Sequence, residues 1–153
     1  MTTATAIPPA AADFAASAAQ SDEYEIMAGH AAVAQSQNPR IRAFAQQMIE
    51  DHTRTRDSLR QAVSAAGLPE PPPAMGSDQA SLLGALQSLS GTEFDQAYAR
   101  QQVLVHDQAL AVQQSYATAG TDPTLKKLAQ SGLPLLRHHL EMIQQIRDSV
   151  GGS

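Results

Sequence analysis

The sequence predicts an all-α protein built from four long helices. Its 42% hydrophobic content comes mostly from Ala, Leu, Ile and Val, and only 4% of residues are aromatic, a balance that suits packed helices better than sheets. Four long stretches carry apolar residues at steps of three and four, the spacing of one helix face. Asn38-Pro39 between the first two stretches resembles Asp122-Pro123 between the last two. The repeat predicts two helical hairpins and a pseudo-duplicated four-helix bundle.

The first hairpin follows a lead-in, residues 1–9, whose small polar and proline residues predict disorder ahead of a folded domain over residues 10–150. Helices are expected over residues 10–36 and 39–66, the second ending at Gly67. The inward stripe of the first helix is predicted to contain Phe14, Ala18, Ser21, Glu25, Ala28 and Ala32. Asn38 is a good N-cap and Pro39 is tolerated in a first turn, so the two helices should pack antiparallel.

A proline-rich crossover over residues 68–75 and a short helix over residues 77–89, capped by Ser77 or Asp78, are expected next. Links between neighbouring helices usually take about 2–8 residues, so this connection should travel along the bundle. The third long helix should then run from the break at residues 90–92 to residue 119.

The last helix is expected from the Asp122-Pro123 cap to residue 150. Pro134 lies inside it and should kink it just before His139. The third and fourth long helices would then form the second hairpin.

The composition limits the possible partners. Ten basic and fifteen acidic residues give a net charge of −5, and no Lys/Arg cluster offers phosphates a track, so nucleic acids and anionic membranes are disfavoured. The absence of cysteine excludes disulfides, thiolate metal sites and thiol catalysis. No run of about 18 apolar residues could span a bilayer, and the opening MTTATAIPPAAADF lacks the basic and apolar regions of a signal peptide. We expect a soluble chain, although an exported protein whose leader had been replaced by Met1 would look the same.

One polar side chain interrupts the apolar stripe of each long helix: Glu25, His52, His106 and His139. Counted from the hairpin turns at a rise of about 1.5 Å per residue, Glu25 and His52 differ in height by about 3 Å, and His106 and His139 by about 5 Å. Helical side chains lean toward their own N-terminus, which brings the members of each pair together. The four side chains are therefore expected to meet near the middle of the bundle.

Such a cluster predicts a metal site. Burying several titratable groups without a cation leaves unsatisfied donors and a costly charge. Neutral imidazole and carboxylate suit zinc, iron, copper, nickel or manganese, so we predict one divalent transition metal held by Glu25, His52, His106 and His139. The alternative is a set of ordinary buried polar residues that satisfy one another and water.

Other side chains near the stripes are weaker candidates. Met48 and Tyr98 could support the site from behind, or could simply fill the core. His30 is a minor candidate ligand. His138 should point about 100° away from His139, toward the surface. Glu50 and Asp51 are expected to be solvated, with a contact from Asp51 to a neighbouring backbone as the alternative.

A set of short motifs occurs here in a specific order. They are Asp51-His52, Leu89-Ser90-Gly91 followed by Phe94-Asp95 and Tyr98, His106, Asp122-Pro123-Thr124-Leu125, and Leu133-Pro134 followed by His139-Leu140. Over about residues 12–146 this set resembles the domain-of-unknown-function 4142 family, bacterial proteins that are usually exported and often carry an outer-membrane-protein label. The resemblance implies a ferritin-like bundle and a periplasmic or envelope setting, but no established activity. It also places Glu25, His52, His106 and His139 on the family's recurring polar positions.

The sequence departs from that family in ways that bear on the metal. Met27 stands where many relatives carry a second Glu, and Val105 and Asp107 flank His106 where Asp and Glu are usual. A second metal is therefore disfavoured. No Glu-x-x-His occurs anywhere, so the di-iron ligands of ferritin-like proteins are incomplete.

Three functions remain open from the sequence. The first is a metal-binding protein with one buried His/Glu site, for storage, delivery, sensing or a redox step. The second is a structural or partner-binding envelope protein whose polar cluster is metal-free and fixes helix register. The third is a metal-dependent oxidoreductase or hydrolase, in which the metal keeps an open position. The metal's identity, a catalytic role and the oligomeric state are not decided by these residues.

Overall fold

The computed structural model describes residues 10–151, which form five helices and no strand. The helices are α1 (Ala11–Gln35), α2 (Pro39–Ala65), α3 (Ser77–Gln87), α4 (Gly91–Ala119) and α5 (Pro123–Ser149). The predicted all-α class is confirmed, and every predicted helix is present with ends close to those expected. The predicted lead-in, residues 1–9, lies outside the described residues.

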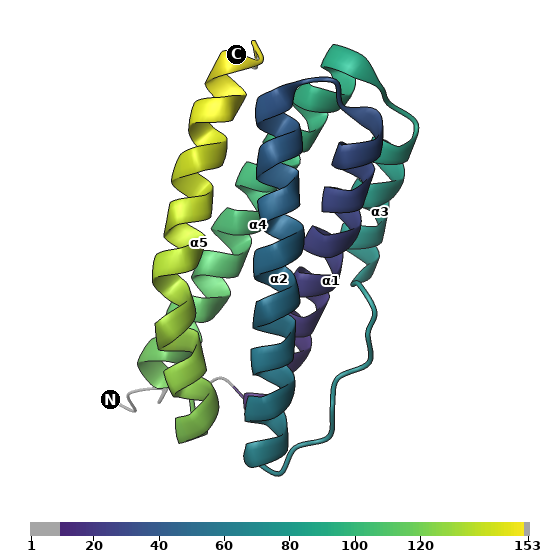
Figure 1. The fold of residues 1–153 in the computed structure, drawn as a ribbon. Coiled ribbons are helices and arrows are strands. Elements are labelled where there is room, and N and C mark those ends of the chain that lie inside the picture. Colours follow the sequence, from purple (N-terminus) through teal and green to yellow (C-terminus); the bar gives the residue numbers. More distant parts are fainter. Residues whose placement is uncertain (1–9, 152–153) are drawn as a thin grey trace, which may run out of the picture.

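The four long helices lie side by side (Figure 1). α1 packs against α2 and α4 against α5, while contacts of α1 with α4 and of α2 with α5 join the two hairpins. The segment after α2 returns along the outside to α3, which packs on α1 and α4, so α4 starts at the same end of the molecule as α2 (Figure 1). None of the described helices is long and apolar enough to cross a membrane.

Both hairpin turns use the predicted caps. Asn38 Oδ1 accepts hydrogen bonds from the backbone N–H of Arg40 at 2.9 Å and of Ile41 at 3.4 Å. Asp122 Oδ1 accepts from the N–H of Leu125 at 3.0 Å. Each cap is followed by a proline at the first helical position, where no intrahelical N–H bond is lost.

The short helix α3 begins differently from the prediction. Gly76 is the N-cap in place of Ser77 or Asp78, and its N–H donates to Oε1 of Gln79 at 2.8 Å. The Gln79 side chain reaches back over the first turn and accepts from the N-cap N–H, as the third helical residue of a capping box does. A serine or aspartate N-cap would instead have accepted from N–H groups inside the first turn. Gly67 does end α2, with a φ of +72° that glycine adopts without a Cβ clash.

The apolar core has two parts. One cluster includes Phe44, Tyr98 and Ile143, and the other includes Phe14 and Tyr116, whose rings stack with centroids 4.3 Å apart. Along α2, α4 and α5, the buried residues His52, His106 and His139 fall between the residues of one cluster and those of the other. α5 continues through Pro134, and the kink predicted there stays a prediction.

Candidate metal centre

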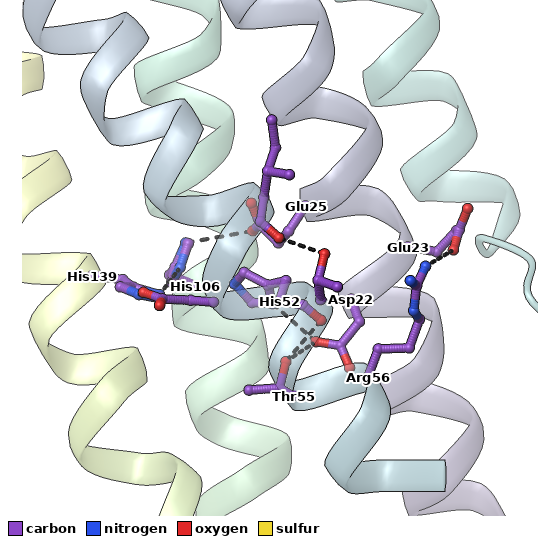
Figure 2. Close-up of polar contacts among 11 residues, drawn as sticks. Asp22, Glu23, Glu25, His52, Thr55, Arg56, His106 and His139 are labelled. Atoms are coloured by element: carbon purple, nitrogen blue, oxygen red, sulfur yellow. Dashed lines mark hydrogen bonds and ion pairs between the residues drawn. The ribbon is translucent and has the colours of Figure 1, made fainter.

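Three histidines from three helices converge at mid-height of the molecule. His52 of α2, His106 of α4 and His139 of α5 are 3%, 1% and 0% exposed, and each offers a ligand atom within 4.8 Å of the other two. Figure 2 shows their rings gathered between the helices, with Asp22 and Thr55 beyond His52. The prediction that these three side chains meet is confirmed.

Each ring uses one nitrogen to contact an acceptor oxygen. The contacts are His52 Nδ1 to Asp22 Oδ1 at 2.9 Å, His106 Nδ1 to the carbonyl oxygen of Gln102 at 2.9 Å, and His139 Nε2 to Asp51 Oδ2 at 2.7 Å. Carbonyl oxygens and carboxylates only accept, so the ring nitrogen in each contact carries the hydrogen. These partners therefore determine the tautomer and the orientation of all three rings.

The second nitrogens of the three rings are the potential ligands. Nε2 of His106 lies 3.4 Å from Nδ1 of His139, and Nε2 of His52 is buried without a hydrogen-bond partner. When all three rings are neutral, each of these atoms carries a lone pair, and facing lone pairs repel unless a proton or metal cation lies between them. A tetrahedral ion with metal–nitrogen distances of about 2.0–2.1 Å separates its ligands by about 3.3–3.4 Å, close to the distance between the His106 and His139 nitrogens.

The two carboxylates behind the rings are themselves held in place. Asp22 Oδ1 also accepts from Thr55 Oγ1 at 2.7 Å, and the other carboxylate oxygen of Asp51 pairs with Arg54. For Asp51 the pKa is lowered because the hydrogen bonds from His139 and Arg54 outweigh the effect of burial, which would raise it. Asp51 is thus an ionised acceptor at neutral pH.

The expectation that Asp51 is solvated was wrong, since it is only 4% exposed. The residue next to a core-facing histidine on a helix points about 100° away. α2 contacts α1 on one side and α5 on the other, so this direction leads to His139 and away from solvent. Glu50 is exposed, as predicted.

Asp22 was missed by the sequence reasoning. It is buried, whereas Ser21, which was placed on the inward stripe of α1, is only partly buried. The available signal was its position three residues before Glu25, on the same face of α1. Alanines occur on every face of α1, so the apolar face could not be distinguished from its neighbours to within one residue.

Glu25 lies beside the cluster but on another edge of it. Its Oε1 is 3.6 Å from Nδ1 of His106, the nitrogen that donates to Gln102, and its Oε2 is buried without a partner. The carboxylate is not in the group of converging ligand atoms found among the described residues. Burial raises its pKa to about 7, although the neighbouring His52 charge and Gln102 act in the opposite direction. The role of Glu25 as a fourth ligand stays a prediction.

The three rings differ in their affinity for protons. Burial, followed by the neighbouring charge of His52, lowers the pKa of His106 to about 3. The pKa of His139 falls to about 4 because burial outweighs the effect of Asp51. For His52, burial acts downward, but the hydrogen bond to Asp22 and the charges of Glu25, Asp22 and Asp51 raise the pKa overall. A proton added to the three neutral rings is therefore held by His52.

The remaining candidates fall into two groups. Met48 and Tyr98 are fully buried in the apolar cluster that contains Phe44, and the Tyr98 hydroxyl has no partner there. Their predicted supporting role stays a prediction. His30 and His138 are exposed, which confirms that His138 points away from His139.

Fold and site together define an all-α protein with a buried three-histidine cluster backed by two carboxylates. A model of the family described as "Domain of unknown function (DUF4142)" matches residues 1–146, and the chain belongs to this family, as the motifs predicted. A search of curated proteins gave no match.

Two solved structures share the fold at 14% sequence identity. The first is the "putative secreted protein DUF305" from Streptomyces coelicolor, with a TM-score of 0.79 over 93% of this chain and 92% of that one. The second is a DUF305 fragment from Deinococcus radiodurans, with a TM-score of 0.78 over 90% of this chain and 94% of that one. At this identity the likeness shows the fold alone.

Proposed function

We propose that His52, His106 and His139 bind one divalent transition metal ion. The observation that carries this proposal is the convergence of three buried imidazole nitrogens whose opposite ring nitrogens already donate to other groups. When all three rings are neutral, their lone pairs face one another, which is costly unless a proton or a metal cation lies between them. A metal ion turns the same geometry into three favourable bonds.

The surroundings of the rings suit a cation. Metal-bound histidines usually donate their other N–H to a carboxylate or carbonyl, which raises their basicity, and Asp22, Asp51 and Gln102 supply these acceptors. The two carboxylates also offset the charge of a divalent ion. Neutral imidazoles accept zinc, copper, nickel, iron or manganese, and among these divalent ions copper binds nitrogen ligands most tightly.

The sequence prediction included Glu25 as a fourth ligand, and we keep this four-ligand site as the alternative to the three-histidine site. In the present arrangement its carboxylate would have to move from the Nδ1 edge of the His106 ring to the edge that faces His139. A site with three protein ligands and one exchangeable position is the simpler proposal from these contacts.

We also propose that the four long helices form a ferritin-like bundle and that the protein works in the periplasm or cell envelope, in metal storage, delivery, sensing or a redox step. The resemblance to exported relatives supports this location, as does the name of the Streptomyces structure with the same fold. Cell fractionation of a strain that expresses the natural gene, probed with an antibody, would test it. Recovery only with cytoplasmic markers would refute the proposed location.

The metal itself is tested by titrating tag-free, chelator-treated protein with Co²⁺, whose visible absorption reports tetrahedral nitrogen coordination. We expect one equivalent of cobalt to bind and zinc to displace it. His52→Ala, His106→Ala and His139→Ala should each abolish the spectrum, whereas the exposed neighbour His138→Ala should retain it. A parent protein that retains none of these metals after desalting would instead favour a metal-free cluster that fixes helix register.

A further inference from the structure

A cavity of about 330 Å³ lies between the histidine cluster and the apolar cluster that contains Phe14 and Tyr116. Residues of all four long helices line it, and it ends against His52, Asp22 and Thr55. Its volume falls at the lower end of the range of small-molecule sites, about 300–1,000 Å³.

The cavity exists because a layer of the core is missing. Residues 16–21 of α1, 53–58 of α2 and 107–115 of α4 contain no fully buried side chain. Small residues stand where a bundle core would carry leucines: Ser17, Ala18, Ser21, Ser58, Ala109 and Gly132 all line the space. Natural cores are close-packed and empty space costs stability, so a void built by four helices at one level points to an occupant.

The cavity has an opening between α1 and α4. A second hollow, lined by residues at the N-terminal end of α1 and by α4, shares Phe14, Ser17 and Val112 with it. Val112 is 38% exposed and lines both hollows. A molecule from solvent can therefore enter past Val112 and travel toward His52.

The lining indicates the chemistry of the occupant. Only Asp22 and His52 among the lining residues are titratable, and no Lys or Arg is present. Asp22 already accepts from His52 and Thr55, so a charged group on the body of a ligand would find no counter-charge. Ser, Thr and Gln side chains line the wall together with Phe, Leu and Val. These surroundings suit an uncharged organic molecule with both polar and apolar surface.

We propose that this cavity binds a small uncharged organic molecule that places one donor atom on the metal ion at its His52 end. The inference rests on the proposed metal site, because three protein ligands leave a tetrahedral ion one exchangeable position. His52 is then the inner end of a ligand pocket, and the small residues of the four long helices give the pocket its size.

The experiment compares two neutral probes on the cobalt-loaded protein: imidazole, which carries only a donor, and 4-phenylimidazole, which adds an apolar ring. Changes in the cobalt spectrum give both dissociation constants. We expect the parent to bind 4-phenylimidazole at least tenfold more tightly than imidazole, because the phenyl ring occupies the cavity.

Two variants fill the cavity from different helices, Ser17→Leu on α1 and Ala109→Leu on α4. Either should keep one equivalent of cobalt and lose the preference for 4-phenylimidazole, with an equal or higher melting temperature. Ala85→Leu, at an exposed position of α3, is the matched control and should keep the preference.

The outcomes separate the two proposals. Cobalt binding without a preference for 4-phenylimidazole, or a preference that survives in both folded cavity-filled variants, overturns the pocket and leaves the metal site standing. Absence of cobalt binding by the parent overturns the metal site and, with it, this inference. Loss of the preference in the filled variants alone supports the pocket.

Discussion

Asp51 Oδ2 lies 2.7 Å from Nε2 of His139, although the next residue in the chain, His52, turns its own ring to Asp22 on α1. Two consecutive residues of α2 thus contact two different neighbouring helices: Asp51 contacts α5 and His52 contacts α1. α2 supplies one candidate ligand and also the carboxylate that orients another. The rotation of this one helix therefore controls two of the three rings.

Replacement of Asp51 by asparagine should weaken metal binding. The amide removes the negative charge of the acceptor to which Nε2 of His139 donates, so the hydrogen is held less firmly on this nitrogen. Loss of such a partner costs about 10–100-fold in metal affinity. Competition with a chromophoric chelator at pH 7.5 measures the change. Glu50→Gln, the exposed neighbouring carboxylate, is the control and should leave the affinity within about twofold of the parent. Equal affinities for Asp51→Asn and the parent would contradict the role of this carboxylate.

Metal binding should release protons near neutral pH. The pKa values of His106 and His139 are lowered, so these rings are already neutral, whereas the raised pKa of His52 keeps a proton on it. A cation must displace that proton, and it also favours ionisation of Glu25, whose pKa is about 7. Affinity should therefore rise with pH between about 6 and 8.

Calorimetric titration in two buffers of different ionisation enthalpy counts these protons. We expect between one and two per metal ion at pH 6.5. Asp22→Asn should lower the number, because the hydrogen bond and charge of Asp22 raise the pKa of His52. Binding without any proton release at this pH would mean that His52 and Glu25 are already deprotonated in the metal-free protein.

The positions of the histidines could be predicted because two simple measures were sufficient. The apolar stripes showed that His52, His106 and His139 face the core, and the capped turns at Asn38 and Asp122 set their heights. Both measures depend on local sequence, and both hairpins follow their local signals. The three rings were therefore brought together correctly before any tertiary contact was known.

The burial of Asp22 and Asp51, the carboxylates that contact the rings, depends on how each helix is rotated and packed, which the stripes and the turns do not give. Asp22 and Ser21 differ by one residue on an alanine-rich helix, and a rotation of about 100° decides which is buried. Asp51 is buried only because α5 lies beside α2. The cavity was not predicted either, since it follows from small residues of four helices at one height. Such features require the relative rotation of the helices.

Replacement of Glu25 by glutamine should stabilise the metal-free protein at high pH. Glu25 has a folded pKa of about 7, above its ordinary value of 4.5, so folding favours its protonated form. The cost of burying its charge is absent below about pH 4.5, grows as pH rises to 7 and is constant above that. Glutamine removes this cost, which is of the order of 1–3 kcal/mol.

Urea unfolding of the chelated proteins at pH 8 and pH 5 tests this expectation. The variant should be more stable than the parent at pH 8, and the difference should shrink at pH 5, where the parent carboxyl is protonated. Glu23→Gln, on the same helix but partly exposed, should show no such trend. A difference that is the same at both pH values would show that the charge of Glu25 is not the cause.

Metal should raise the melting temperature near neutral pH and lose this effect in acid. A ligand at 100 times its dissociation constant stabilises the folded state by about 2.7 kcal/mol, which corresponds to about 5–10 °C for a chain of this size. At pH 5 protons compete at His52, so the increase should be smaller than at pH 7.5. His139→Ala should lose the increase, while His138→Ala should keep it because His138 is exposed. The comparison uses the metal-induced change within each variant, so the lower baseline expected for His139→Ala, which loses a buried ring, does not affect it. Equal metal-induced shifts in these two variants would place the site away from His139.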